Sequence, residues 1–371
     1  MTDRLGAVLA GAVPRVCPAA VALIAVDGIV AATAAAGELV RYADAEGTLA
    51  EERPPAGRDS IFDLASISKL FTTAVLLSLA EEGTIGLDEP VAAWMPGHDP
   101  RVTPRRLLTH TAGLPPTRRI DLELPGADAS ERMEAMLRTP IAHPVGGPYL
   151  YSDVGLIIAG RVAELAGGAP LDALVRARVT DVLGLPDTGY RPAALSRAAP
   201  LAQTATPSRA AVLSRVAATE WKPERPGPGC VRGEVHDETA YALGGVAGHA
   251  GVFATAGDLL AFGEALRLGG GGVLRPGSVA EMLRDQGAEG AAFRHGLGVR
   301  IGDPAIVGPL TGAFGHSGFT GTSLVVDPAR GLTVVLLTNA VHPVRGRDGI
   351  RELRHAVAGE ALRLRELQPL T

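Results

Sequence analysis

Residues 63–82 read DLASISKLFTTAVLLSLAEE, and the rest of the chain can be organised around them. From Ser66 to about Glu82 the stretch has no Gly or Pro and apolar residues on almost every face, which predicts a buried helix ending at Gly83. Lys69 lies one helical turn after Ser66 on the same side, so a hydroxyl and an amine can meet, and the helix N-terminus directs partial positive charge at the hydroxyl. The spacing therefore predicts an activated serine nucleophile.

Lysine is rare in this chain. Of the 35 Lys and Arg residues, only Lys69 and Lys222 are lysine, so 35 − 2 = 33 are arginine. Arginine cannot give up its proton in a protein, whereas a buried lysine can. A lysine inside an apolar helix therefore indicates a site that needs a neutral amine. The alternative is a lysine whose ammonium group reaches solvent from an amphipathic helix.

Length and charge limit the function classes. A chain of 371 residues can form about two domains or one large domain with ample core. The net charge of −5 gives no field for nucleic acid, and no run of Lys or Arg suggests a membrane surface. We therefore expect a small-molecule or peptide substrate as the partner, with no nucleic acid and no membrane. The oligomeric state does not follow from the sequence.

Cysteine usage and the N-terminal residues add further expectations. Cys17 and Cys230 are too few for a disulfide framework, and neither has metal-ligand spacing, so we expect no cofactor and no metal. Residues 1–13 lack a basic start followed by a long Leu-rich segment and predict a first helix rather than a signal peptide. A cytoplasmic location is the resulting expectation.

Strand patterns lie at both ends of the sequence and helical patterns in the middle. Two apolar runs joined by Asp27-Gly28 predict a hairpin. The strands that we predict are 21–26, 29–35, 296–301, 322–326 and 332–338, and the main helices are 130–138, 156–165, 171–183, 259–268 and 351–364. This order predicts an α/β (α+β) fold in which an antiparallel sheet with terminal helices carries an inserted, mainly helical domain. We place the sheet domain at 1–62 and 246–371, the helical domain at 63–245 and the active site between them.

Two further segments are placed to contribute to chemistry. Tyr151 precedes a helix by one turn, and Gly315–Gly318 feeds a strand. Serine acylation needs a nucleophile, a base, an oxyanion trap and an acid for the leaving group. Lys69 would act either as a neutral base after burial or as a cation beside the tyrosine. His110, by contrast, is predicted to be structural, bonded to backbone between two helices.

Four patches together resemble a known family. They are Ser66–Lys69 as S-x-x-K, Tyr151–Asp153 in the place of Y-x-N, His316–Gly318 in the place of K-T-G, and Leu107–Pro115 as L-L-T-H-T-A-G-L-P. The chain resembles the serine β-lactamases and penicillin-binding-protein-like hydrolases, in the class C branch with its esterases and amidases. The resemblance covers most of the chain and implies a β-lactamase/transpeptidase-like fold. It also implies a serine hydrolase that forms an acyl-enzyme.

The resemblance assigns roles to individual residues. Ser66 would be acylated, Lys69 and Tyr151 would share the proton transfers, and the backbone N–H groups of Ser66 and Phe319 would form the oxyanion hole. Gly245 would lie on one rim of the pocket. The remaining substrate-contacting or oxyanion candidates are Asp153, His316, Ser317 and Gly318.

Two residues depart from the family's pattern. Asp153 stands where Asn is frequent, and His316 stands where lactamases have Lys. Histidine is mostly neutral at pH 7 and lacks the permanent charge that holds an antibiotic carboxylate, which weakens the case for efficient β-lactam hydrolysis. Asp153 either orients Lys69 or caps the helix that follows it.

A narrower resemblance concerns the substrate. Residues 233–238, 244–251 and 319–324 resemble the branch that includes N-acetylmuramoyl-L-alanine amidases, which would make a muropeptide the substrate. The alternatives are a broad esterase, a weak β-lactamase or D-amino-acid peptidase, and acyl transfer in biosynthesis. A protein of another class, a non-catalytic sensor of cell-wall fragments or a scaffold, also stays open.

Other polar groups have competing interpretations. His236, Asp237 and His249 could be imagined as metal ligands, but their spacing fits no zinc pattern and favours hydrogen bonding or substrate contact. Arg345 and Arg347 could hold a substrate carboxylate, whereas a solvated loop is the default in an arginine-rich chain.

Overall fold

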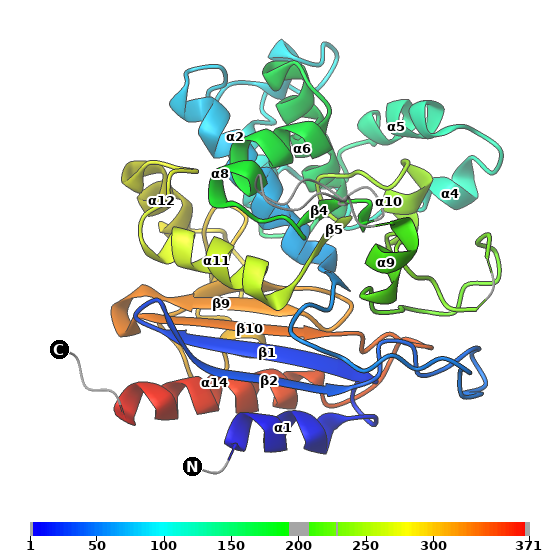
Figure 1. Cartoon of the computed structure of the whole chain (residues 1–371). Coiled ribbons are helices and arrows are strands. Elements are labelled where there is room, and N and C mark those ends of the chain that lie inside the picture. The colour runs from blue at the N-terminus through cyan, green and yellow to red at the C-terminus, as the bar shows by residue number, and fades with distance from the viewer. Residues whose placement is uncertain (1–2, 193–207, 228, 368–371) are drawn as a thin grey trace.

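A seven-stranded antiparallel sheet lies in the lower half of the view in Figure 1, between the two terminal helices below it and the other helices above it. The computed structural model describes residues 3–192, 208–227 and 229–367. The strand order is β2-β1-β10-β9-β8-β7-β6, and the strands are β1 (Ala19–Val26), β2 (Ile29–Gly37), β6 (Arg294–His295), β7 (Arg300–Ile301), β8 (Phe314–Ser317), β9 (Ser323–Asp327) and β10 (Leu332–Thr338). The antiparallel sheet and mixed α/β class are as predicted.

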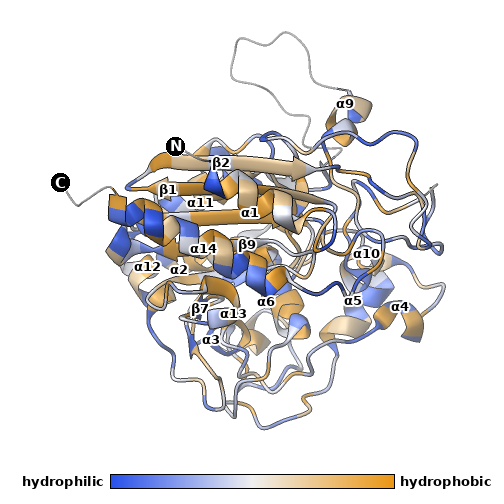
Figure 2. Ribbon diagram, turned by 90° about the horizontal axis from the view of Figure 1, so that it is seen from below, coloured by the Kyte–Doolittle hydropathy of each residue, from blue (hydrophilic) through white to orange (hydrophobic). Residues whose placement is uncertain are grey.

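Alternation along β1 explains why both faces of the sheet are covered. All eight residues of β1 are buried. Val21 and Leu23 belong to a core shared with the helical part, whereas Ala22 and Ile24 belong to a second core with the terminal helices. Successive side chains of a strand point to opposite faces, so one apolar strand supplies both cores. Helices α1 (Arg4–Ala12) and α14 (Ile350–Leu367) cover the second core, as Figure 2 shows from below.

The helical part rests on the opposite face of the sheet, with α11 in contact with β1, β9 and β10. Its helices are α2 (Ser68–Glu81), α3 (Pro104–Leu108), α4 (Ile120–Glu123), α5 (Ala129–Leu137), α6 (Asp153–Gly167), α7 (Leu171–Val175), α8 (Asp181–Leu183), α9 (Arg209–Ser214), α10 (Glu238–Ala242), α11 (Ala256–Arg267) and α12 (Pro276–Leu283); α13 (Pro304–Val307) lies between β7 and β8. A small second sheet has the order β3-β5-β4, with β3 (Phe62–Asp63), β4 (Gly189–Tyr190) and β5 (Val252–Ala254).

Short 3₁₀ segments and one π segment complete the list: η1 (Ala65–Ile67), η2 (Val91–Ala93), η3 (Arg176–Thr180) and η5 (Pro328–Arg330). Of these, η1 lies within residues 63–82 and changes where the predicted helix begins. The α-helix α2 begins at Ser68 and not at Ser66, because Ala65 takes a left-handed φ of 46° and residues 65–67 form a 3₁₀ turn. The helix ends close to Gly83, as predicted.

The strand predicted at 296–301 is mostly wrong. Only Arg300–Ile301 pairs as a strand, because Gly298 has a φ of 66° and its N–H bonds to the carbonyl of Leu108 rather than to a neighbouring strand. The predicted hairpin and the strand at 332–338 are confirmed. The composition of 191–232, which is rich in Ala, Pro and Arg with little periodicity, also predicts an irregular surface segment. Part of it, 193–207, lies outside the described residues.

The division of the chain at 62/63 and 245/246 stays a prediction. The structure does show β3 and η1 close to the first boundary and β5 a few residues after the second. Within the described ranges, no single helix is long and apolar enough to span a membrane, and one bent pair, α6 with Leu171–Leu183, meets the length and composition criteria across a 76° bend.

Candidate active site

Ser66 and Lys69 meet at the start of α2, as the spacing predicted. Lys69 is fully buried, and its Nζ donates to Ser66 Oγ at 2.8 Å and to the carbonyl of His249 at 3.1 Å. Asp153 Oδ1 lies 2.8 Å from the same nitrogen. The three ammonium hydrogens thus have a hydroxyl, a carbonyl and a carboxylate to interact with.

The surroundings of Lys69 decide its protonation state. Burial by itself would lower the pKa of Lys69, but the negative charge of Asp153 beside its ammonium group and a further contribution from the nearby Tyr151 outweigh the burial, so the pKa lies above its usual value. Of the two alternatives that the sequence left open, the neutral base and the cation, the structure therefore favours the cation. Ser66 Oγ accepts a hydrogen bond from an ammonium group in this arrangement.

The turn before α6 answers the question about Asp153. Ser152 is the N-cap of α6, since its Oγ accepts the N–H of Gly155 at 3.0 Å, so capping does not need Asp153. Asp153 is half-buried and pairs with Lys69 instead. The N–H of Ser152 donates to His110 Nδ1 at 3.0 Å, which confirms the structural role predicted for His110.

Tyr151 lies among cations and aromatic rings. Lys69 Nζ is 4.9 Å and Arg300 Cζ 5.0 Å from the centroid of its ring. His110 and His316 lie 4.6 Å and 6.2 Å away between ring centroids. Two positive charges therefore lie within cation–π distance of one phenol ring.

Strand β8 brings the third motif to this site. His316 is buried and its Nδ1 lies 2.8 Å from the carbonyl of Ser317, so this nitrogen carries the proton. Burial and the nearby charges of Lys69 and Arg300 hold the pKa of His316 well below its usual value. His316 is therefore neutral and supplies no charge for an anion.

The residues after His316 pack on the nucleophile segment. A Cβ on Gly318 would lie 2.4 Å from the carbonyl oxygen of Leu64, so only glycine fits this close approach. The side chain of Phe319 is 59% exposed, although it follows a buried strand. Residues 318–319 thus lie against the segment that leads into Ser66.

The glycine-rich segment 244–251 reaches Lys69 from the other side. The backbone of this segment packs closely against α6, because a Cβ on Gly248 would lie 2.0 Å from the carbonyl oxygen of Leu156. The segment also presents the His249 carbonyl to Lys69. Neither contact tests the rim position of Gly245, which stays a prediction.

Asp237 and His249 form a pair beside Lys69. His249 Nε2 lies 2.9 Å from Asp237 Oδ1, and Asp237 also caps α10 by accepting the N–H of Ala240 at 2.7 Å. The hydrogen-bonding role favoured for both residues is confirmed. Within the described residues, no group of three or more His, Cys, Asp or Glu side chains could hold a metal ion.

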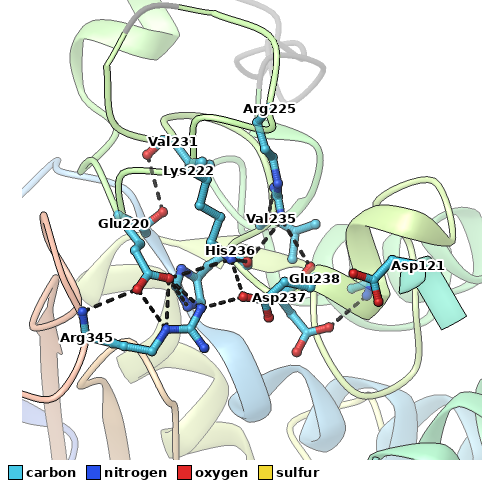
Figure 3. A network of polar contacts seen from close by, with 12 residues as sticks. Asp121, Glu220, Lys222, Arg225, Val231, Val235, His236, Asp237, Glu238 and Arg345 are labelled. Carbon is cyan, nitrogen blue, oxygen red and sulfur yellow. Dashed lines mark hydrogen bonds and ion pairs between the residues drawn. The ribbon is translucent and has the colours of Figure 1, made fainter. Parts of the chain in front are cut away.

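A charged cluster, which we define as Glu220, Lys222, Glu238 and Arg345, lies next to this region (Figure 3). Lys222 Nζ donates to Glu238 Oε1 at 2.6 Å and to the His236 carbonyl at 2.8 Å. Arg345 binds the carboxylate of Glu220 with Nε and Nη2 and also contacts Glu238. The predicted solvated loop is consistent with the 41% exposed side chain of Arg345, and the structure adds that two carboxylates hold its guanidinium group.

The comparisons with known proteins agree with the site geometry. The family model described as Beta-lactamase matches residues 15–358. The chain belongs to the Beta-lactamase family. An Escherichia coli K12 protein with the provisional name D-alanyl-D-alanine carboxypeptidase is 31% identical over 332 residues, covering 80% of this chain and 73% of that protein. A Salmonella schwarzengrund protein of the same provisional name is 30% identical and covers 77% and 71%.

Solved structures of other proteins match almost the whole chain. EstCE1, a hydrolase with promiscuous acyltransferase activity, has a TM-score of 0.71 and 26% identity over 96% of this chain and 98% of that chain. A penicillin-binding protein homologue from Caulobacter crescentus has a TM-score of 0.67 and 20% identity over 96% of each chain and shows the fold alone. The protein is a serine hydrolase that acts on amide or ester bonds.

Sequence reasoning missed Arg300 and Asp63, and it named Asp237 and His249 without predicting that they contact each other. Arg300 is one of 33 arginines and carries no local pattern that would single it out. The Asp237–His249 pair depends on two loops meeting in space. Asp63 stands inside the opening stretch, three residues before Ser66, and this proximity was the one available signal.

Proposed function

We propose that Ser66 is the nucleophile and forms an acyl-enzyme with a peptide whose scissile amide lies next to a carboxylate, as in a peptide ending in D-alanyl-D-alanine. The observation that carries the nucleophile is the 2.8 Å contact between Lys69 Nζ and Ser66 Oγ, beneath the ring of Tyr151. A hydroxyl beside a buried cation and a phenol is equipped for acylation.

The proton transfers follow from the charge of Lys69. Because Lys69 is cationic, it cannot accept the proton of Ser66, and Tyr151 takes it as the phenolate. Ser66 Oγ forms a bond to the carbonyl carbon, and the oxygen becomes an oxyanion held by the N–H groups of Ser66 and Phe319. Tyr151 then gives the proton to the leaving nitrogen as the C–N bond breaks. Water repeats the sequence and releases the acid.

Arg300 supports the choice of substrate. Its guanidinium group lies 5.0 Å from the ring of Tyr151, and its Nη1 donates to Asp303 at 3.0 Å. Arg300 Nε is buried without a hydrogen-bond partner within the part of the chain that the structure describes. Since His316 is neutral, Arg300 is the cation suited to bind a carboxylate beside the scissile bond. The provisional name of the bacterial relatives points to the same substrate class.

A second candidate is the amide between a muramoyl group and the stem peptide. Phe319 supports it, because its ring is 59% exposed and packs on His236, with 5.7 Å between centroids, as an apolar platform for a sugar face. Both bonds occur in one molecule, so one substrate separates the two candidates.

Incubation with an N-acetylmuramoyl-pentapeptide ending in D-alanyl-D-alanine tests the proposal, with products resolved by mass spectrometry. We expect release of D-alanine and covalent labelling of Ser66 by a fluorophosphonate. Release of the intact pentapeptide would favour the muramoyl amide instead. Equal labelling of wild type and Ser66→Ala would rule out Ser66 as the nucleophile.

A further inference from the structure

A buried carboxylate without a cation stands three residues before Ser66. Asp63 ends β3 and is 2% exposed. Its Oδ1 accepts the N–H of Ala65 at 2.8 Å, and its Oδ2 accepts the N–H of His236 at 2.7 Å. No ion pair within the described ranges includes Asp63. A buried carboxylate is costly unless it is paired, so one held by backbone donors alone calls for a reason.

The first of the two N–H groups that donate to Asp63 belongs to Ala65, whose backbone conformation is strained. Ala65 has a φ of 46°, a conformation that residues other than glycine seldom adopt. Ala65 directly precedes Ser66, so its backbone conformation sets the direction of the Ser66 N–H and of the Ser66 side chain. The hydrogen bond from Ala65 to Asp63 stabilises this conformation.

Residues 63–64 also contact the segment around Phe319, which is proposed to supply the second N–H group of the oxyanion hole. Thr320 Oγ1 donates to the Asp63 carbonyl at 2.8 Å, and Thr322 Oγ1 donates to the Leu64 carbonyl at 3.2 Å. Both threonines lie within three residues of Phe319, whose N–H is the second donor proposed for the oxyanion. Residues 63–64 therefore contact the chain on both sides of the hole.

A third link runs through His236. The N–H of His236 is bound by Asp63, and the His236 ring stacks on the ring of Phe319 with an interplanar angle of 23°. The Asp63 carboxylate thus holds the backbone of Ala65 directly. It also holds the backbone of His236, whose ring supports the ring of Phe319.

We infer that Asp63 is a positioning residue that sets the spacing between the Ser66 and Phe319 backbone N–H groups and so pre-organises the oxyanion hole. The inference rests on the proposed role of Ser66. Asp63 touches no substrate atom and acts through the backbone. Both of its oxygens must be acceptors, so the ionised form is the active one, since a protonated carboxyl turns an O–H toward a backbone N–H.

The charge state of Asp63 supplies a measurable signature. Burial raises the pKa of Asp63 to about 6; the N–H groups of His236 and Ala65 oppose the rise, Asp237 adds to it and Arg225 opposes it. Activity is expected to fall as pH drops through about 6. The folded pKa lies above the unfolded one, so protonation of this group does not destabilise the fold as pH falls from 6 to 4. Loss of activity without loss of stability distinguishes positioning from simple unfolding.

The test compares Asp63→Asn with Asp258→Asn. Asp258 serves as the control, because its half-buried carboxylate also joins two segments outside the site, accepting the N–H of Asp187 at 3.0 Å and the hydroxyl of Thr188 at 2.9 Å. The readouts are kcat and KM on p-nitrophenyl acetate between pH 5 and 9, with thermal unfolding in parallel. Asp63→Asn is expected to lower kcat on the order of 10²-fold, to leave KM within a few-fold and to abolish the acidic limb. Asp258→Asn is expected to keep the wild-type profile.

Two further variants make every outcome decisive. Thr320→Val removes only the hydroxyl that bonds the Asp63 carbonyl and is expected to lower kcat about 10-fold in a folded protein; it replaces Asp63→Asn if that variant does not fold. Wild-type kcat in both variants, or an equal loss in Asp258→Asn, would overturn the inference. Ser66→Ala is assayed beside them, and full activity in that variant would show that the proposed nucleophile is wrong rather than the role of Asp63.

Discussion

The two lysines of this chain are both buried, yet their surroundings differ. Lys69 meets one hydroxyl, one carbonyl and one carboxylate, with a phenol ring above it. Lys222 meets the carboxylate of Glu238 and a carbonyl, in a cluster where Arg345 competes for the same carboxylates. Burial and rarity are shared by both lysines, so neither property alone identifies a catalytic amine.

The partners make the difference. A hydroxyl is the group within reach of Lys69 that can become a nucleophile, whereas Lys222 neutralises carboxylates that already have a second cation. The rarity of lysine raised the expectation for Lys69 in the sequence, but the same argument would have selected Lys222. A catalytic lysine is identified by what it faces.

Replacement of Lys69 is expected to have the largest effect. Lys69→Met removes the cation beside Ser66 and should lower kcat by about 10³-fold or more. Lys69→Arg keeps the charge but not the compact ammonium geometry, and should be nearly as inactive. Ester hydrolysis and fluorophosphonate labelling measure both variants. Near-normal labelling of Lys69→Arg would show that only the charge matters.

Lys222→Met is expected to affect stability rather than chemistry. It leaves Glu238 with Arg345 alone and the His236 carbonyl with Arg225 as its remaining donor, so the free energy of unfolding should fall by about 3 kcal/mol. Activity of the folded protein should stay within about 5-fold, because no reacting group is lost. Denaturant unfolding and active-site titration measure the two quantities. A folded Lys222→Met as inactive as Lys69→Met would erase the distinction between the lysines.

Arg300→Gln tests whether a third cation, Arg300, binds the carboxylate of the substrate. We expect KM for a peptide ending in D-alanyl-D-alanine to rise about 10-fold or more, with a smaller change for a neutral ester, because only the peptide has a carboxylate to bind. Arg294→Gln, an exposed neighbour on β6, is the control. Equal losses on the peptide and the ester would assign Arg300 to Tyr151 rather than to the substrate.

Asp153→Asn should produce the smallest effect, a shift in pH dependence. Removing this carboxylate lowers the pKa of Lys69, so the alkaline limb of kcat/KM should move to lower pH. The raised pKa of Lys69 also means that its stabilising contribution is present below its unfolded pKa and is lost as pH rises through the folded pKa. Asp88→Asn, at an exposed carboxylate paired with Arg105, should leave the profile unchanged. An unshifted limb would mean that Lys69 does not set it.

The sequence was sufficient for β1, β2, β9, β10, the main helices and the meeting of Ser66 with Lys69, because these depend on local periodicity and on i,i+3 spacing. It did not predict β6, the small second sheet or β8, where Gly315–Ser317 form part of a strand and do not merely precede one. It placed the α-helix start two residues early, since the left-handed φ of Ala65 has no compositional signal in a residue that is not glycine. It also extended a strand over 296–299, where Gly296 and Gly298 allow a turn.

The sequence predicted the site residues that belong to local motifs. It did not predict the residues that reach the site through contacts between distant segments. Arg300, Asp237 and Asp63 act through contacts between loops and strands far apart in the chain, and no spacing rule reaches them. Substrate identity depends in part on segments near 117–148 and 191–232, whose conformation no periodicity fixes. The substrate therefore stays a prediction. The cytoplasmic location is also still a prediction.

The burial of both lysines also has a practical consequence. Side-chain amines are exposed only when the fold opens, since the exposed fractions are 0% for Lys69 and 5% for Lys222. An amine-reactive reagent such as an N-hydroxysuccinimide ester should therefore modify these side chains at rates set by local opening. Because one lysine sits at the nucleophile and the other in the charged cluster, the two labelling rates, separated by peptide mass, would report the opening of each region independently.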